Sequence, residues 1–97
     1  MADVRREVLD EAARLIAGPR NETHGDYTVE AARIGAMWGA LLQLPEPIPP
    51  RKVAAMMIAL KLARATTGRV NQDDWVDAAG YAALGAQIDA DLAAVWT

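Results

Sequence analysis

Apolar residues recur along this chain every three or four positions in four segments, which is the spacing of α-helices that each bury one face. The first segment runs from about Asp3 to Ala17. It ends at Gly18-Pro19, a helix stop followed by a residue that cannot continue a helix. Its apolar stripe consists of Val4, Val8, Leu9, Ala12, Leu15 and Ile16.

The second segment predicts a helix that begins after Thr28, with that hydroxyl as N-cap and Glu30 in the first turn near the positive end of the helix dipole. Asp26 is the alternative cap. We expect the helix to bury a stripe formed by Ile34, Met37, Trp38, Leu41 and Leu42.

The proline-rich segment 44–50 excludes a helix and predicts a stiff connector. Pro50 suits the first position of a third helix, which should run to about Thr66 and close at Gly68. Asn71 predicts the cap of a fourth helix. That helix should run to about Ala94, unless the glycine at 80 or 85 breaks it.

Composition agrees with this pattern, because the chain is rich in alanine, lacks phenylalanine, and has few β-branched residues. We predict an all-α fold, a small antiparallel bundle of about four helices, in a single domain over residues 1–97. Without cysteine, disulfides and thiolate metal sites are excluded. We expect a homo-oligomer for two reasons. Small residues at four-residue spacing would let a partner helix approach closely, and the chain has more large apolar residues in its C-terminal part than a small bundle can bury. The residues concerned are Ala78, Ala82 and Ala86, and Trp75, Leu92, Val95 and Trp96.

Charge and hydropathy indicate where the protein is located and which partners it does not bind. The N-terminus is charged at once, and the longest apolar run, residues 53–60, is too short to span a bilayer, so we expect a cytoplasmic protein with no membrane contact. A net charge of −3 argues against nucleic-acid binding. A helix-turn-helix reading of the third and fourth helices would also point Asp73, Asp74 and Asp77 at DNA phosphates.

Two helices place charge in otherwise apolar faces. Lys61 and Arg64 share a face of the third helix, and Asp77 shares a face of the fourth with Asp74 and Tyr81. One interpretation is a structural ion pair between Lys61 or Arg64 and Asp77, because an unpaired buried charge is costly. In the other interpretation these groups line a pocket. Asp74 and Asp77 then hold Mg²⁺, and the two cations meet phosphate oxygens.

The segment Asn21–Thr28, "NETHGDYT", carries more polar chemistry than a helix connection needs. It holds His24, the chain's one histidine, between the carboxylates of Glu22 and Asp26. A single histidine does not make a zinc site, so we interpret His24 first as a group that contacts a ligand or pairs with a carboxylate, or as a structural residue. A role as a metal ligand is the third alternative. Glu22 has no evident structural role within the loop, so it is the loop carboxylate that we expect to face a ligand or catalytic site.

Three motifs in order, "ETHGDY", "MMIALKLAR" and "DDWVDAAGYAALG", resemble a small family of phage and prophage proteins of unknown function. The resemblance covers about residues 21–86. It places the family positions at Glu22, His24, Gly25, Asp26, Lys61, Arg64, Asp74, Asp77 and Tyr81.

A more remote similarity is to the MazG-like all-α nucleotide pyrophosphohydrolases, whose E-x-x-E and E-x-x-D motifs hold Mg²⁺. Asp74 and Asp77 match the second motif with Asp for Glu. The first motif is missing, since Arg33 stands three residues after Glu30, and Glu22 and Asp26 would have to substitute from the loop.

Three functions follow as hypotheses. The first is a Mg²⁺-dependent hydrolase of nucleotide phosphates, and the second is a binder of nucleotides or nucleotide-derived signals without turnover. The third is a helical assembly protein whose internal charges are only paired. The expected catalytic residues are Glu22, His24 and Asp26; the expected ligand-binding residues are Lys61, Arg64 and Tyr81; the expected metal ligands are Asp74 and Asp77.

Overall fold

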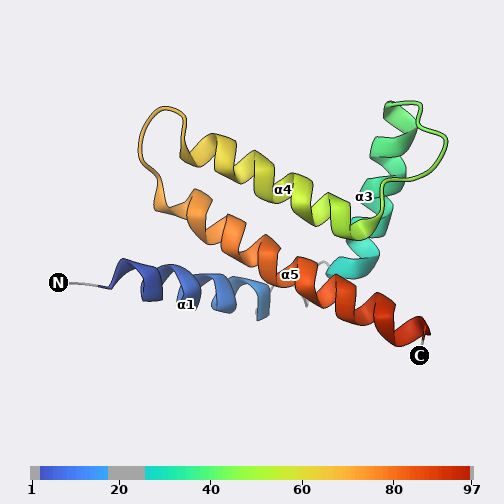
Figure 1. Ribbon diagram of the computed structural model, residues 1–97. Helices are drawn as coiled ribbons and strands as arrows, with labels where there is room; N and C mark the ends of the chain where they lie inside the picture. Colours follow the sequence, from blue (N-terminus) through green and yellow to red (C-terminus); the bar gives the residue numbers. More distant parts are fainter. Residues whose placement is uncertain (1–2, 18–25, 97) are drawn as a thin grey trace.

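The structure of the chain, a computed structural model, describes residues 3–17 and 26–96, with side chains as far as residue 93. These residues form an all-α bundle and contain no strand, which confirms the predicted fold class. Figure 1 shows the four helices: α1 is Val4–Ala17, α3 is Tyr27–Leu41, α4 is Pro50–Ala65, and α5 is Gln72–Trp96. None of the described helices combines the length and apolar character needed to cross a membrane.

The centre of the fold is an antiparallel hairpin of α4 and α5 (Figure 1). Pro50 occupies the first turn of α4, as predicted. Gly68 adopts φ +73° in the turn, a conformation that glycine adopts without steric cost. The Asp73 N–H donates to Asn71 Oδ1 at 3.0 Å, which confirms Asn71 as the cap of α5.

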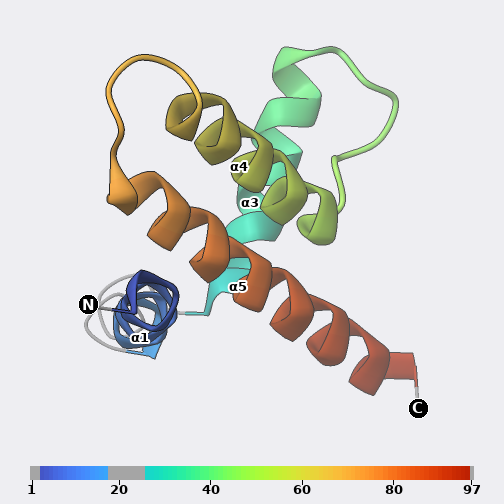
Figure 2. The same ribbon diagram turned by 60° about the vertical axis from the view of Figure 1, so that its left-hand side comes forward.

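Helix α5 runs unbroken through both of its internal glycines, which instead mark where its neighbours approach. A methyl group on Gly80 would lie 3.4 Å from Ile16 Cγ2 of α1, and one on Gly85 would lie 3.4 Å from the Ala54 Cβ of α4. In Figure 2 α1 and α4 lie on different sides of α5. At these distances a methyl group at either position would make an ordinary van der Waals contact with the neighbouring helix.

Helix α3 lies across the hairpin and begins two residues earlier than the Thr28 cap predicts (Figures 1 and 2). Its N-cap is Asp26, whose Oδ1 accepts the Thr28 N–H at 2.8 Å. The expected cap at Thr28 is therefore wrong and the alternative at Asp26 is confirmed. The Thr28 hydroxyl donates to Asp91 on α5 at 2.7 Å, so it is occupied elsewhere.

The buried face of α3 also differs from the prediction, because the helix turns its small residues inward. Its buried residues are Tyr27, Ala31, Gly35 and Gly39. The connector packs onto this face: the Ile48 N–H donates to the Gly35 carbonyl at 3.1 Å, and a methyl group on Gly39 would lie 3.1 Å from Pro47 Cα. The Leu44 N–H, which donates to the Gly39 carbonyl at 2.9 Å, closes the C-terminus of α3. A Cβ at Gly35 would overlap the Ile48 carbonyl oxygen, so only glycine permits this approach.

The predicted stripe of α3 is consequently left largely outside. Ile34 and Trp38 are half-buried against the core, whereas Met37, Leu41 and Leu42 are 66%, 79% and 62% exposed. The core itself consists of Tyr27, Ala31, Ile48, Val53, Ala54 and Ile88.

The molecule is elongated for its length. Its extents are 50 × 32 × 24 Å and its radius of gyration is 14.8 Å, against about 12.5 Å for a compact domain of this size. The elongation follows from α5, which is longer than the helices that pack on it.

Candidate functional site

Two ion pairs join α4 to α5 at the charged positions that the sequence singles out. Lys61 Nζ lies 3.0 Å from Asp77 Oδ2, and the two side chains are 14% and 36% exposed. Arg64 Nε lies 3.4 Å from Asp74 Oδ1. The predicted ion pair between Lys61 and Asp77 is thus confirmed, and Arg64 pairs with Asp74 rather than with Asp77.

The Arg64–Asp74 pair is strongly asymmetric in its burial. The Asp74 side chain is 7% exposed and the Arg64 side chain is 60% exposed. A carboxylate taken out of water needs a compensating charge or hydrogen bonds, and the guanidinium supplies one. The helix N-terminus adds to this, since Asp74 lies in the first turn of α5.

Tyr81 connects this charged region to the start of α3. It follows Asp77 by one turn, and its ring centroid lies 6.0 Å from that of Tyr27 with an angle of 51° between the ring planes. Tyr27 is the first residue of α3 and directly follows Asp26. Tyr81 thus lies one turn from Asp77 and against Tyr27, whereas Asp26 caps α3, and its grouping with Lys61 and Asp77 stays a prediction. Glu22 and His24, the other two loop positions, lie outside the described residues.

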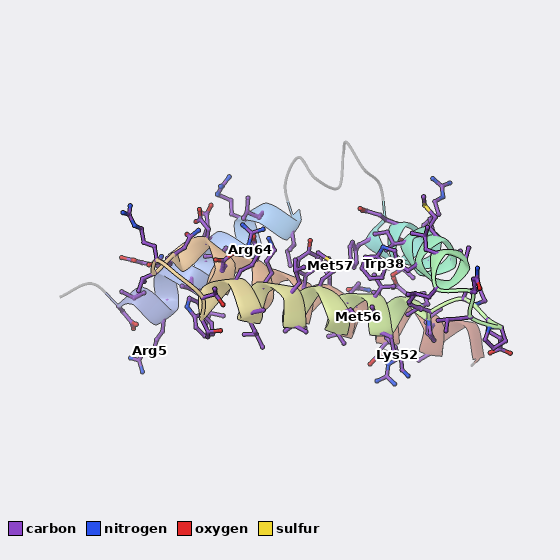
Figure 3. All side chains as sticks on the ribbon, turned by 90° about the horizontal axis from the view of Figure 1, so that it is seen from above. Arg5, Trp38, Lys52, Met56, Met57 and Arg64 are labelled. Carbon is purple, nitrogen blue, oxygen red and sulfur yellow. The ribbon has the colours of Figure 1, made fainter. Side chains whose placement is uncertain are left out.

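Figure 3 shows several side chains on and beside α4. Trp38, Met57 and Arg64 lie along one side of the helix, and Lys52 points away on the other side. Lys61 and Arg64 are three residues apart and share this face with Met57, as their spacing predicts. The face therefore carries a positive end and an apolar end.

The predicted metal ligands are each engaged by a cation. Among residues 3–17 and 26–93, no group of three or more histidine, cysteine or carboxylate side chains is placed to hold a metal ion. Asp74 and Asp77 are paired with Arg64 and Lys61, as described above. A Mg²⁺ site at Asp74 and Asp77 stays a prediction.

A cavity of about 680 Å³ lies between α1, the start of α3 and α5, and sequence reasoning missed all but Asp26 of its polar groups. Among the described residues, its lining includes the polar side chains of Asp26, Tyr27, Thr28, Gln87 and Asp91. Asp91 accepts hydrogen bonds from Thr28 Oγ1 and from Gln87 Nε2, each at 2.7 Å. These bonds, that from Thr28 first, lower the pKa of the Asp91 carboxyl below its ordinary value. The i, i+4 spacing of Gln87 and Asp91 could have predicted their hydrogen bond from the sequence. The bond between Thr28 and Asp91 could not be predicted in this way, because the two residues are 63 positions apart.

A third interhelical pair, also missed, joins the other end of the hairpin. Arg51 Nε lies 2.8 Å from Asp89 Oδ1, and Arg51 Nη2 donates to Asp89 Oδ2 at 3.2 Å. Both side chains are at least half exposed, so this bidentate contact is a surface pair. It provides a natural comparison for Arg64 and Asp74.

Fold and site together define a small all-α domain with charged pairs between its two longest helices. Residues 7–89 match the family described as "Domain of unknown function (DUF6378)", and the chain belongs to this family. It is similar to the "Gene 55 protein" of Mycobacterium phage L5, with 40% identity over 77 residues, and to that of Mycobacterium phage D29, with 35% identity over 75 residues.

These matches cover 79% and 77% of this chain and 49% and 48% of the two relatives, so the chain spans about half the length of the curated proteins it matches. The expected resemblance to a phage family of unknown function is confirmed. No solved structure matches the chain.

Proposed function

We propose that this domain binds a nucleotide, or a signalling molecule derived from one, without turning it over, and that Lys61, Arg64 and Tyr81 contact the ligand. The observation that carries this proposal is the asymmetry of Arg64. A buried aspartate holds its guanidinium at Nε, while 60% of the side chain remains exposed.

An arginine fixed in this way is suited to anion recognition. The guanidinium is planar and carries five N–H donors, and a contact at Nε leaves the far edge of the fork directed elsewhere. Holding the side chain in place in advance lowers the entropy that a phosphate would otherwise lose in ordering it. Lys61 adds a second positive charge one turn away on the same helix.

The aromatic part of the site would receive the nucleoside. Tyr81 is half-buried, stands one turn beyond Asp77 and is braced by the Tyr27 ring. Aromatic faces stack on nucleobases in a sequence-tolerant way. The proposed ligand therefore combines an aromatic base with at least one phosphate.

Binding without turnover is the form of nucleotide handling that the described contacts support best. A Mg²⁺-dependent hydrolase needs carboxylates open to the metal, and Asp74 and Asp77 both face a basic side chain. In the binder the same aspartates hold the cations in position.

The test is thermal unfolding of the purified chain against mononucleotides, dinucleotides and inorganic phosphate, with Mg²⁺ and with chelator. A ligand at 100 times its dissociation constant stabilises the native state by about 2.7 kcal/mol. For a domain of this size each kcal/mol raises the midpoint by about 4–8 °C. We expect such a shift with chelator present.

Arg64→Lys and Arg51→Lys form the matched pair of variants. Both retain the charge opposite an aspartate of α5, but only the first alters the fork proposed to meet phosphate. We expect Arg64→Lys to weaken binding and Arg51→Lys to leave it unchanged. A shift that requires Mg²⁺ would instead support the hydrolase, and no shift with any compound would support the scaffold of paired charges.

A further inference from the structure

The apolar pattern of α3 disagrees with its burial at two positions of one stripe, Met37 and Leu41. Ile34, Met37, Trp38 and Leu41 recur at i, i+3, i+4 and i+7, the spacing of a helix face that is buried. We call these four residues the α3 stripe. Within one chain α3 buries its glycine face instead; Ile34 and Trp38 are half-buried against the core, and Met37 and Leu41 remain 66% and 79% exposed.

We propose that the α3 stripe is the contact between two copies of this chain in a two-fold symmetric dimer. The stripe contains no charged residue, so two identical stripes can meet without burying an unpaired charge. A two-fold contact uses the same patch on both subunits and therefore requires a self-complementary surface. Dimerisation would bury the α3 stripe, which has the apolar spacing of a buried helix face.

The surface area of the chain is consistent with such a contact. The chain exposes 7096 Å², whereas a compact monomer of its mass exposes about 5,400 Å². A stable interface of standard size buries about 800 Å² on each partner. This excess accompanies the elongated shape and is spread over the whole chain, and Met37 and Leu41 are the stripe residues that contribute most to it. Leu42 and Leu44, 62% and 45% exposed, extend the apolar area beyond the stripe toward the connector.

The contact is independent of the proposed ligand site. Lys61, Arg64 and Tyr81 belong to α4 and α5, and of the stripe only Trp38 lies on the side of α4 that carries Arg64. Failure of nucleotide binding would therefore leave the dimer standing, and absence of a dimer would leave the ligand proposal standing.

The first experiment measures the molar mass of the chain by light scattering after size-exclusion chromatography. We expect twice the chain mass of 10.4 kDa. Leu41→Glu should give a monomer with unchanged helical circular dichroism, because this residue is exposed within one chain. Leu9→Glu is the matched control: Leu9 is 64% exposed on α1, so the same substitution there should leave the dimer intact.

A second experiment locates the two-fold axis without disturbing the fold. The native chain has no cysteine, so a single introduced cysteine reports on its own surroundings. Under mild oxidation we expect Met37→Cys to form an interchain disulfide at least about tenfold faster than Leu9→Cys, because proximity raises the effective concentration. A monomeric wild-type chain would overturn the proposal. A dimer that stays intact in Leu41→Glu and dissociates in Leu9→Glu would also overturn it. Equal rates of cross-linking for Met37→Cys and Leu9→Cys would overturn it as well.

Discussion

Arg64 Nε lies 3.4 Å from Asp74 Oδ1, and the contact joins an exposed cation to an aspartate that is almost wholly buried. Loss of the contact has different costs for the two side chains. Without Asp74, the exposed Arg64 side chain is solvated by water. Without Arg64, the buried Asp74 carboxylate has no water to solvate it. Energetically, the contact therefore supports the folded state mainly through the aspartate.

Replacing Arg64 by alanine should lower the free energy of unfolding by about 1.5–3 kcal/mol, because a buried carboxylate loses its charged partner. Arg51→Ala removes a pair whose two members are exposed, and it should cost about 0.2–1 kcal/mol. Urea unfolding of the two variants measures both quantities. Equal losses would show that the burial of Asp74 has no energetic consequence.

Gly35→Ala should destabilise the fold by at least about 1–3 kcal/mol, because the added methyl group overlaps the Ile48 carbonyl oxygen and displaces the connector. Gly80→Ala is the control, since its methyl group would make ordinary contact with Ile16. Alanine is also a better helix former than glycine by about 1 kcal/mol, so Gly80→Ala should be neutral or stabilising. Thermal midpoints distinguish the two outcomes. A Gly35→Ala chain as stable as the wild type would contradict the close approach of the connector.

Thr28→Val should reduce stability in a pH-dependent manner. The Thr28 hydroxyl lowers the pKa of Asp91, so its contribution is complete above the ordinary aspartate pKa and is lost as the pH falls through the lowered value. The difference in unfolding free energy between wild type and Thr28→Val should therefore be largest near neutral pH and shrink in acid.

Urea titrations at a series of pH values measure this difference. Thr66→Val is the control, because the Thr66 hydroxyl donates to the Leu62 carbonyl, which does not titrate. Its effect should stay constant over the same range. A Thr28→Val difference that does not change with pH would argue against the bond to Asp91.

Asp26→Ala should lower the unfolding free energy by about 0.5–2 kcal/mol through loss of the α3 cap. Asp26→Asn keeps a side-chain oxygen that can accept the Thr28 N–H, and it should retain most of the stability. Chemical unfolding of both variants tests the assignment. If the asparagine variant lost as much as the alanine variant, Asp26 would act through its charge rather than as a cap.

The sequence predicts α4 and α5 well because their boundaries are set by local chemistry. Pro50, Gly68 and Asn71 each act within a few residues of their own position, and the structure places all three as expected. The pair of Lys61 and Asp77 could also be predicted, since each charge interrupts an apolar face and an isolated buried charge is costly.

The errors arise where distant segments compete for the same face. The i, i+3, i+4 pattern of α3 favoured its large apolar side chains, but the connector needs carbonyl partners and approaches at Gly35 and Gly39. Asp91 was missed because its partner Thr28 is 63 residues away in the sequence. The loop positions Glu22 and His24 stay predictions, as do their roles.

Helix α1 packs on α5 alone among the described helices, and Ala12 is its one buried residue. An element held this weakly opens first in native-state hydrogen exchange, while the remaining helices stay protected. Because Ile16 and Ala17 form one wall of the cavity beside Asp91, each such opening would dismantle that cavity without unfolding the molecule. The rate at which α1 detaches from α5 would therefore determine how long the cavity persists, and this rate is independent of global unfolding.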